Sequence, residues 1–236
     1  MIPKTIHLCW FSDEPYPVEI KACLDSWHRY MPDYQIRRWT MADARAIGCP
    51  FIDEALECHK WAFAADVVRF YALWKEGGVY MDSDILLYRG FQELITEEGC
   101  VTFTENITPE SQPSLQAAFV IASAGNAYCK ALVDYYQSRH FLRADGTMDE
   151  TVSPRIMAQL AQPLGMTWTE TIQHLDGLTI YPTAYVAPRK KFPRTEETFA
   201  RHLVNHSWRK QKLMRTIDKK MHHYYHVVKY ALFRRY

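Results

Sequence analysis

The sequence has no run of about 18 consecutive apolar residues, so it offers no segment that could span a membrane as a helix. It also lacks a basic start followed by a short apolar stretch, so no secretory signal peptide is visible. Its six cysteines are scattered and form no Cys-x-x-Cys pair. Without an export signal, they are most simply free thiols of a reducing compartment. We therefore expect a cytoplasmic protein.

Internal repeats and low-complexity segments are also absent. A chain of 236 residues with 48% hydrophobic and 23% charged residues suits one soluble domain with a sizeable core. Charge is unevenly placed, because residues 189–236 hold 14 of the 28 Lys and Arg but 3 of the 27 Asp and Glu. A basic tail on an acidic body favours an anionic partner such as a membrane surface, a polyanion or a nucleotide. The alternative is a solvated terminal helix.

Hydrophobic periodicity predicts alternating strands and helices, and therefore an α/β fold. Two glycines, Gly77 and Gly78, end the second predicted helix by supplying left-handed conformations. Strands are expected at 4–11, 34–40, 79–88, 100–104, 117–123 and 178–188, and helices at 18–32, 58–78, 126–141, 153–165 and 217–236.

Two aspartates stand two residues apart within the strand-like run GGVYMDSDILLY, residues 77–88. In an extended chain, Tyr80, Asp82 and Asp84 would share one face. Adjacent carboxylates repel each other, and burying them unpaired is costly. A divalent Mg²⁺ or Mn²⁺ ion would resolve this, since such hard ions take carboxylate ligands and leave positions open for phosphate oxygens. Strand ends are also the usual ligand site of open α/β sheets.

Other interpretations of this pair stay open. A bare Asp-x-Asp can be a surface feature at a strand end. An EF-hand is disfavoured because Ile85, Leu86 and Leu87 offer no side-chain oxygen ligands. A phosphohydrolase that uses the first Asp as its nucleophile would usually carry Thr where this chain has Leu86, and no second acidic loop is evident.

The helix before the glycines carries Asp66 and Arg69 three residues apart, so both lie on one helical face. Exposed, they would form a weak ion pair. The rest of this face is Ala, Val and Phe, so a buried pair beside the Asp-x-Asp run would instead hold polar ligand atoms.

Four stretches together carry a resemblance: IPKTIHLCWFS, CLDSWHRYMPDYQIRRW, AADVVRFYALWKEGGVYMDSDI and HLVNHSW. In this order they resemble the family 32 glycosyltransferases, which include mannosyl-, galactosyl- and N-acetylglucosaminyltransferases. More distantly they are similar to the catalytic domain of the large glucosylating toxins. The resemblance covers about residues 2–40, 58–90 and 200–208. It implies a GT-A fold, a nucleotide-sugar-binding sandwich with a Rossmann-like mixed sheet flanked by helices.

Within that fold, the resemblance implies a catalytic domain over 1–212. The charge and the spacing of apolar residues predict a basic amphipathic helical tail over 213–236. The resemblance implies a metal-dependent retaining glycosyltransferase that moves a hexose or N-acetylhexosamine from a UDP- or GDP-sugar. The acceptor would be a glycan or lipid-linked glycan, in the synthesis of a bacterial surface polysaccharide such as capsule or lipopolysaccharide. A binding module that has lost catalysis is the alternative, since only turnover separates the two.

The family's pattern assigns catalytic roles to Asp66, Arg69, Asp82 and Asp84. Asp84 would bind Mn²⁺ or Mg²⁺ directly. Asp82 would contact the ribose or sugar of the donor, or reach the metal through water. Asp66 and Arg69 would bind hydroxyl groups of the donor sugar, and Tyr80 would border the same pocket.

Donor-side and metal-side residues are also implied near the two ends of the domain. Trp10 would stack on the nucleotide base, the alternative being a core residue. A histidine ahead of a Ser-Trp pair usually completes the metal site, which favours His202. Because Leu203 stands where the family often has a second histidine, His206 and Asn205 remain alternatives, with Ser207 and Trp208 on the donor side.

The terminal helix at 217–236 carries Lys and Arg beside an aromatic stripe. Such a helix can lie on an anionic bilayer, which suggests peripheral binding to the inner face of the membrane; packing on protein is the alternative. No recognisable motif supports nucleic-acid binding. Ser153-Pro154 departs from the family's usual Gly-Pro, so the acceptor is not inferred from the middle of the chain.

Overall fold

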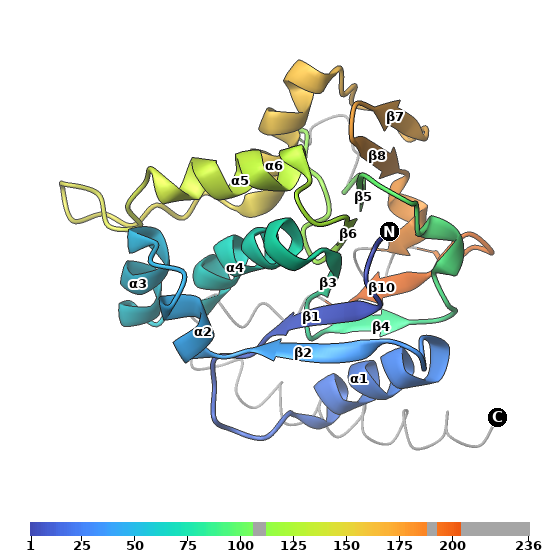
Figure 1. Cartoon of the computed structure of the whole chain (residues 1–236), viewed down its shortest axis with the longest axis horizontal. Coiled ribbons are helices and arrows are strands. Elements are labelled where there is room, and N and C mark those ends of the chain that lie inside the picture. The colour runs from blue at the N-terminus through green and yellow to red at the C-terminus, as the bar shows by residue number, and fades with distance from the viewer. Residues whose placement is uncertain (106–111, 188–192, 204–236) are drawn as a thin grey trace.

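The computed structural model describes residues 1–105, 112–187 and 193–203, and these form two β-sheets with flanking helices (Figure 1). The larger sheet has seven strands in the order β2-β1-β3-β6-β5-β8-β7, and the smaller has three in the order β4-β10-β9. Parallel and antiparallel pairs are mixed in both sheets. The strands are β1 (Thr5–Cys9), β2 (Gln35–Trp39), β3 (Gly78–Met81), β4 (Ile85–Leu87), β5 (Cys100–Phe103), β6 (Phe119–Ala122), β7 (Gln173–Leu175), β8 (Leu178–Tyr181), β9 (Val186–Ala187) and β10 (Ala200–His202).

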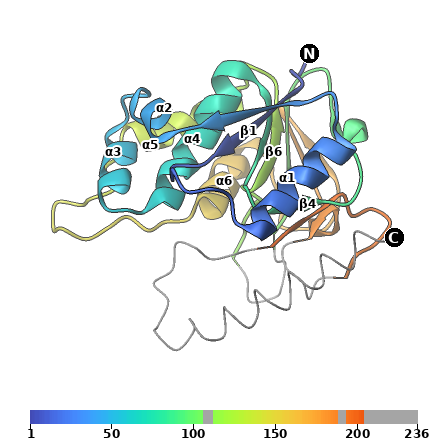
Figure 2. The same ribbon diagram turned by 90° about the horizontal axis from the view of Figure 1, so that it is seen from below.

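Helices cover both faces of the larger sheet. Helices α2 to α6 pack on one face, and α1 with the smaller sheet packs on the other (Figures 1 and 2). The helices are α1 (Val18–Tyr30), α2 (Met41–Arg45), α3 (Pro50–Glu57), α4 (Trp61–Glu76), α5 (Ala127–Gln137) and α6 (Ser153–Ala161), with 3₁₀ turns at Gln92–Leu94, Gln162–Leu164 and Thr183–Tyr185. The mixed α/β sandwich predicted from the sequence is confirmed.

Strand β3 lies in the interior of the larger sheet, between β1 and β6, and is buried on both faces. It pairs in parallel with β1 and antiparallel with β6. Tyr80 points into the core beneath the helices, whereas Val79 and Met81 point into the core beneath α1 and the smaller sheet. This two-residue alternation fixes which way the chain points when it leaves β3 after Met81.

Gly77 and Gly78 join α4 to β3 as the sequence predicts. Their φ angles are +67° and +108°, a region that favours glycine. A Cβ on Gly78 would lie 2.6 Å from the carbonyl oxygen of Thr5, and one on Gly77 would lie 2.6 Å from the backbone nitrogen of Ala124. The two glycines therefore permit a tight turn and a close approach of β3 to β1.

The run at 77–88 is not one strand, and here the sequence prediction is wrong. β3 ends at Met81, the backbone N–H of Ile85 donates to the carbonyl oxygen of Asp82 at 3.0 Å, and β4 begins at Ile85 in the other sheet. Asp82 and Asp84 therefore flank a turn instead of sharing a strand face. Helices α2 and α3 and strands β7 and β10 were also not predicted.

The basic helix predicted at 217–236 lies outside the described residues, as does the boundary predicted at residue 212. Among the helices that are described, none has the length and apolar character needed to cross a bilayer.

Candidate active site

The paired aspartates lie at a point where the sheet's connections diverge. From β1 the chain passes through α1 to β2 on one side, and it returns through α2, α3 and α4 to β3 on the other side. The carboxyl ends of β1 and β3 therefore border a topological switch point, where open α/β sheets bind their ligands. Asp82 directly follows the end of β3.

Backbone and side-chain bonds hold the aspartate turn in place. The N–H of Asp82 donates to the carbonyl oxygen of Ala118 at 2.9 Å, and the hydroxyl of Tyr80 donates to Oδ1 of Asp82 at 2.7 Å. The carbonyl oxygen of Asp84 accepts from the N–H of Leu203 at 3.0 Å. The backbone at both aspartates and the carboxylate of Asp82 are thus held in place before any ligand binds.

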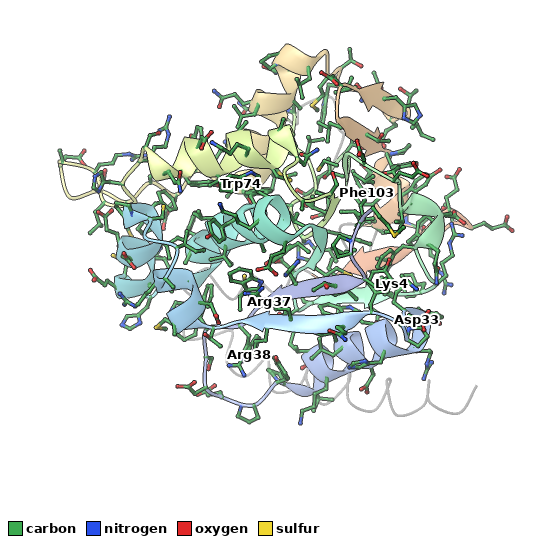
Figure 3. All side chains as sticks on the ribbon, viewed as in Figure 1. Lys4, Asp33, Arg37, Arg38, Trp74 and Phe103 are labelled. Atoms are coloured by element: carbon green, nitrogen blue, oxygen red, sulfur yellow. The ribbon has the colours of Figure 1, made fainter. Side chains whose placement is uncertain are left out.

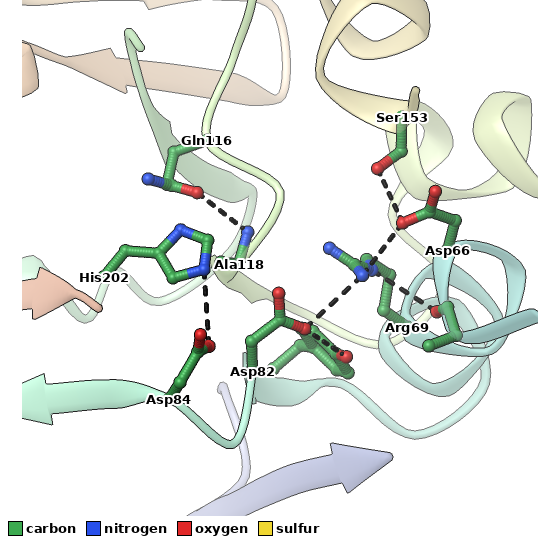
Figure 4. Close-up of polar contacts among 10 residues, drawn as sticks. Asp66, Arg69, Asp82, Asp84, Gln116, Ala118, Ser153 and His202 are labelled. Atoms are coloured by element: carbon green, nitrogen blue, oxygen red, sulfur yellow. Dashed lines mark hydrogen bonds and ion pairs between the residues drawn. The ribbon is translucent and has the colours of Figure 1, made fainter. Parts of the chain in front are cut away.

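His202 reaches the turn because β10 pairs antiparallel with β4, which places His202 opposite Ile85. Its Nε2 lies 3.3 Å from Oδ1 of Asp84 (Figure 4). Among the described residues, Asp82, Asp84 and His202 form one group whose potential ligand atoms all lie within 4.8 Å of one another. Two aspartates and a histidine separated by more than a hundred residues therefore meet at one place.

The chemistry of this group fits a divalent cation. Burial alone would lower the pKa of His202, but the charge and hydrogen bond of Asp84, with a smaller effect of Asp82, raise it to about 9. Nδ1 of His202 is buried and finds no hydrogen-bond partner among the described residues. Two carboxylates that hold a proton on a half-buried imidazole form a site that strongly prefers positive charge. Carboxylate oxygens are the ligands that Mg²⁺ and Mn²⁺ favour.

Arg69 supplies the positive charge on the other side of Asp82. Its Nη2 lies 2.9 Å from Oδ1 of Asp66 and 3.4 Å from Oδ1 of Asp82. Its Nε donates to the carbonyl oxygen of Ala65, and the guanidinium stands 4.8 Å from the centre of the Tyr80 ring. The helical pair predicted from sequence spacing is thus buried and bridges α4 to the aspartate turn.

Burial shapes the protonation of this network. It raises the pKa of Asp66 to about 6, although Arg69 and the hydrogen bonds from Ser153 oppose that rise. For Arg69, burial acts to lower the pKa, but the charge of Asp82 and of other neighbours raises it above its ordinary value. Arg69 therefore stays charged and opposes the effect of burial on Asp66.

Trp10 follows β1 at the same edge of the sheet. Its ring packs edge-on against Tyr16 with centroids 4.8 Å apart, and its Nε1 donates to the carbonyl oxygen of Glu14 at 3.2 Å. Arg38, which extends from β2 on the side opposite Arg37 (Figure 3), donates to the carbonyl oxygens of Trp10 and Ser12. Trp10 is half-buried and fixed; its contact with a base stays a prediction.

The structure gathers six of the residues predicted for the site, and four lie beyond the described part of the chain. The six are Asp66, Arg69, Tyr80, Asp82, Asp84 and His202 (Figure 4). The four are Asn205, His206, Ser207 and Trp208. The individual roles assigned by resemblance stay predictions.

Two further polar residues border the site and were not predicted as site residues. Gln116 is 1% exposed, and its Oε1 accepts from the N–H of Ala118. Its Nε2 is buried and has no hydrogen-bond partner in the part of the chain that the structure describes. Figure 4 shows this amide above the ring of His202. An unpaired buried amide is costly unless a ligand bonds to it. Ser153 donates to Asp66. Neither residue had a sequence signal, because the contact of Ser153 with Asp66 and the position of Gln116 beside the site (Figure 4) both depend on long-range folding.

Comparison with known proteins finds similarity over part of the chain. Residues 17–101 match the family described as "Glycosyltransferase sugar-binding region containing DXD motif". The chain is 32% identical over 101 residues to inositol phosphoceramide mannosyltransferase 3 of Schizosaccharomyces pombe, a match that spans 40% of this chain and 27% of that protein. The chain therefore covers about a quarter of that relative's length.

The fold also has a solved counterpart. The structure of the PaToxG glycosyltransferase aligns over 69% of each chain with a TM-score of 0.51 and 17% sequence identity, a likeness that shows the fold. Together with the family match, it confirms the resemblance and the GT-A-like sandwich predicted from the sequence.

Proposed function

We propose that this chain, whose residues 17–101 match the DXD-containing sugar-binding region of glycosyltransferases, is a metal-dependent retaining glycosyltransferase. It would move a hexose or N-acetylhexosamine from a UDP- or GDP-sugar to a glycan or lipid-linked glycan. The observation that carries the proposal is that the group of Asp82, Asp84 and His202 lies beside the buried Asp66–Arg69 pair. The group of two aspartates and a histidine suits a metal ion and a diphosphate, and the Asp66–Arg69 pair suits the hydroxyl groups of a sugar.

Asp84, His202 and Asp82 would hold Mn²⁺ or Mg²⁺. When bound there, the ion would act as a Lewis acid that stabilises the negative charge developing on the departing diphosphate. The chain prepares this site itself: Arg69 and the hydroxyl of Tyr80 both contact Oδ1 of Asp82 and hold that carboxylate in one orientation, so little reorganisation is needed during the reaction.

The sugar would be bound by Asp66 and Arg69. A carboxylate accepts and a guanidinium donates, so together they match the hydroxyl groups of a hexose. Both are buried and already bonded to each other, which holds them in position before the donor arrives. Trp10 would stack on the base, at the end of β1.

The bond changes require no protein nucleophile. An acceptor hydroxyl oxygen would bond to the anomeric carbon from the face that the phosphate leaves, as the bond from that carbon to the phosphate oxygen breaks. The proton of the hydroxyl would pass to the departing phosphate. In this mechanism the residues of the chain bind, orient and balance charge.

We expect nucleotide release to identify the donor. A panel of UDP- and GDP-sugars with Mn²⁺ should give release from one donor, which EDTA should reduce to background and added Mn²⁺ or Mg²⁺ should restore. Nucleotide binding without turnover across the panel would favour a binding module that has lost catalysis. Phosphate release from phosphomonoesters, with nucleotide-sugars left intact, would favour a phosphohydrolase. Absence of both binding and turnover would contradict the proposal.

The acceptor and the place of action are a further part of the proposal. We infer an acceptor in bacterial surface polysaccharide synthesis, such as capsule or lipopolysaccharide, and peripheral binding at the inner face of the membrane. The support for membrane binding is the charge of residues 189–236, because basic residues gain about 1 kcal/mol each near an anionic surface. The full chain should float with vesicles that contain phosphatidylserine, and a chain ending at Met214 should float less. Equal flotation would count against membrane binding.

A further inference from the structure

Ser153 makes a contact with the site that its position in the sequence does not suggest. It is the first residue of α6, 87 residues after Asp66, and is 1% exposed. Its hydroxyl donates to Oδ1 of Asp66 at 2.8 Å (Figure 4), and its backbone also hydrogen-bonds to Asp66. Ser153 lies beyond residues 17–101, which match the family.

The start of α6 is itself held by the part of the chain that holds Asp82. The carbonyl oxygen of Pro154 accepts from the N–H of Leu115 at 3.0 Å. Three residues later, the carbonyl oxygen of Ala118 accepts from the N–H of Asp82 at 2.9 Å. Ser153 therefore approaches Asp66 from a scaffold that is also anchored to the aspartate turn.

Asp66 is consequently fixed from two directions. Arg69 contacts its Oδ1 from within α4, and Ser153 contacts the same oxygen from α6. A carboxylate bonded from one direction can turn about its last side-chain torsion, which has broad energy wells, whereas a second bond from another element restricts that rotation. The side chain of Asp66 keeps 13% of its surface exposed, so part of it remains available to a ligand.

We propose that Ser153 is a positioning residue that holds the carboxylate of Asp66 in the orientation that binds a hydroxyl group of the donor's sugar. This inference rests on the proposed function, because it requires a nucleotide-sugar in the site. It assigns α6 a part in sugar binding and none in binding the nucleotide. A serine that merely anchored the helix would affect sugar and nucleotide alike.

Binding measurements separate these two roles. We expect Ser153→Ala to weaken the binding of GDP-mannose or UDP-glucose about tenfold, as loss of a hydrogen bond to a charged group does, and to change the Kd of GDP or UDP less than about twofold. Calorimetry with Mn²⁺ on the full chain measures both. The control is Ser123→Ala, since Ser123 bonds to Gly99 near the opposite end of β3 and its loss should change neither affinity.

A pair of isosteric variants isolates the hydroxyl. Ser153→Thr keeps the hydroxyl and adds a methyl group, and Ser153→Val has the same shape without the hydroxyl, so any strain from the added methyl cancels between them. We expect the threonine variant to have about tenfold lower KM for the donor than the valine variant, with kcat within about threefold. Equal KM values would overturn the assignment.

A double-mutant cycle tests whether the effect passes through Asp66. In an Asp66→Ala background, Ser153→Ala should change sugar-nucleotide affinity less than about twofold. A tenfold loss in that background would overturn the proposal, as would equal losses for nucleotide and nucleotide-sugar in the single variant. If the wild-type chain binds no member of the panel of UDP- and GDP-sugars, the proposed function itself fails; if it binds one and Ser153→Ala binds it equally well, only the role of Ser153 fails.

Discussion

Replacing Asp84 with asparagine should lower turnover by about a thousandfold while the chain remains folded. Asparagine keeps the size of the side chain but removes the negative charge that contacts His202 and would bind the cation. With one carboxylate fewer, the charge on the departing diphosphate would be poorly stabilised. The measurement is kcat with the donor that the release assay identifies.

The effect on folding should be small because two changes oppose each other. The variant loses the contact between Asp84 and His202 but also loses repulsion between the two neighbouring carboxylates. The melting temperature should therefore shift little while the affinity for Mn²⁺ falls. Asp33→Asn is a suitable control, since Asp33 forms an exposed pair with Lys4 and should retain full activity. Near-normal turnover of the Asp84→Asn variant would contradict the metal-site assignment.

The sequence predicted the central features that depend on local spacing. Gly77 and Gly78 adopt the positive φ angles expected of them, and Asp66 and Arg69 face the same way because they are three apart on a helix. Two short helices were missed although their start signals were present. Thr40 and Asp43 form a capping box at α2, and Pro50 opens α3.

The prediction failed where distant pairing decides the local structure. An alternating run suggested one strand through Asp82 and Asp84. Instead, the chain leaves the larger sheet after β3, and β4 pairs with β10 in the smaller sheet. That pairing breaks the alternation after Met81 and places His202 beside Asp84. Nothing within the run itself shows that its second half belongs to another sheet.

Contacts between residues far apart in the chain could not be predicted from the sequence either. Ser153 reaches Asp66 across 87 residues, and its identity suggested only a departure from the family's usual glycine. Gln116 contacts Ala118 through an ordinary local bond, yet its amide lies by the site because the backbone nearby pairs with Asp82. In both cases the fold supplies the functional position, and the residue type alone does not.

Replacing Arg69 with methionine should have the largest effect on stability. Arg69 is 5% exposed and lies within 3.4 Å of carboxylate oxygens of both Asp66 and Asp82. Methionine fills similar space without charge, so both carboxylates would lose their buried cation. Removing one partner of a buried ion pair costs about 3–5 kcal/mol, and we expect the free energy of unfolding to fall by that amount at pH 8 in a urea titration.

The loss of unfolding free energy in the Arg69→Met variant should be smaller at pH 5 than at pH 8, because of the protonation of Asp66. Burial already raises the pKa of Asp66 from its ordinary value to about 6 in the folded chain, and removing Arg69 would raise it further. A carboxyl group whose pKa is raised by folding lowers the free energy of unfolding as the pH rises from its pKa in the unfolded chain to its pKa in the folded chain. At pH 5 the variant can keep Asp66 neutral, which avoids an unpaired buried charge.

A matched exposed arginine separates this effect from the general loss of a positive charge. Arg37 pairs with Glu76 on the surface, where an ion pair contributes about 0–1 kcal/mol, so Arg37→Met should cost no more than that and should show no comparable pH dependence. Two outcomes would contradict this account: equal losses of unfolding free energy in the two variants, or a loss in Arg69→Met that is the same at pH 5 and pH 8. Either would mean that Arg69 does not neutralise the buried carboxylates of Asp66 and Asp82.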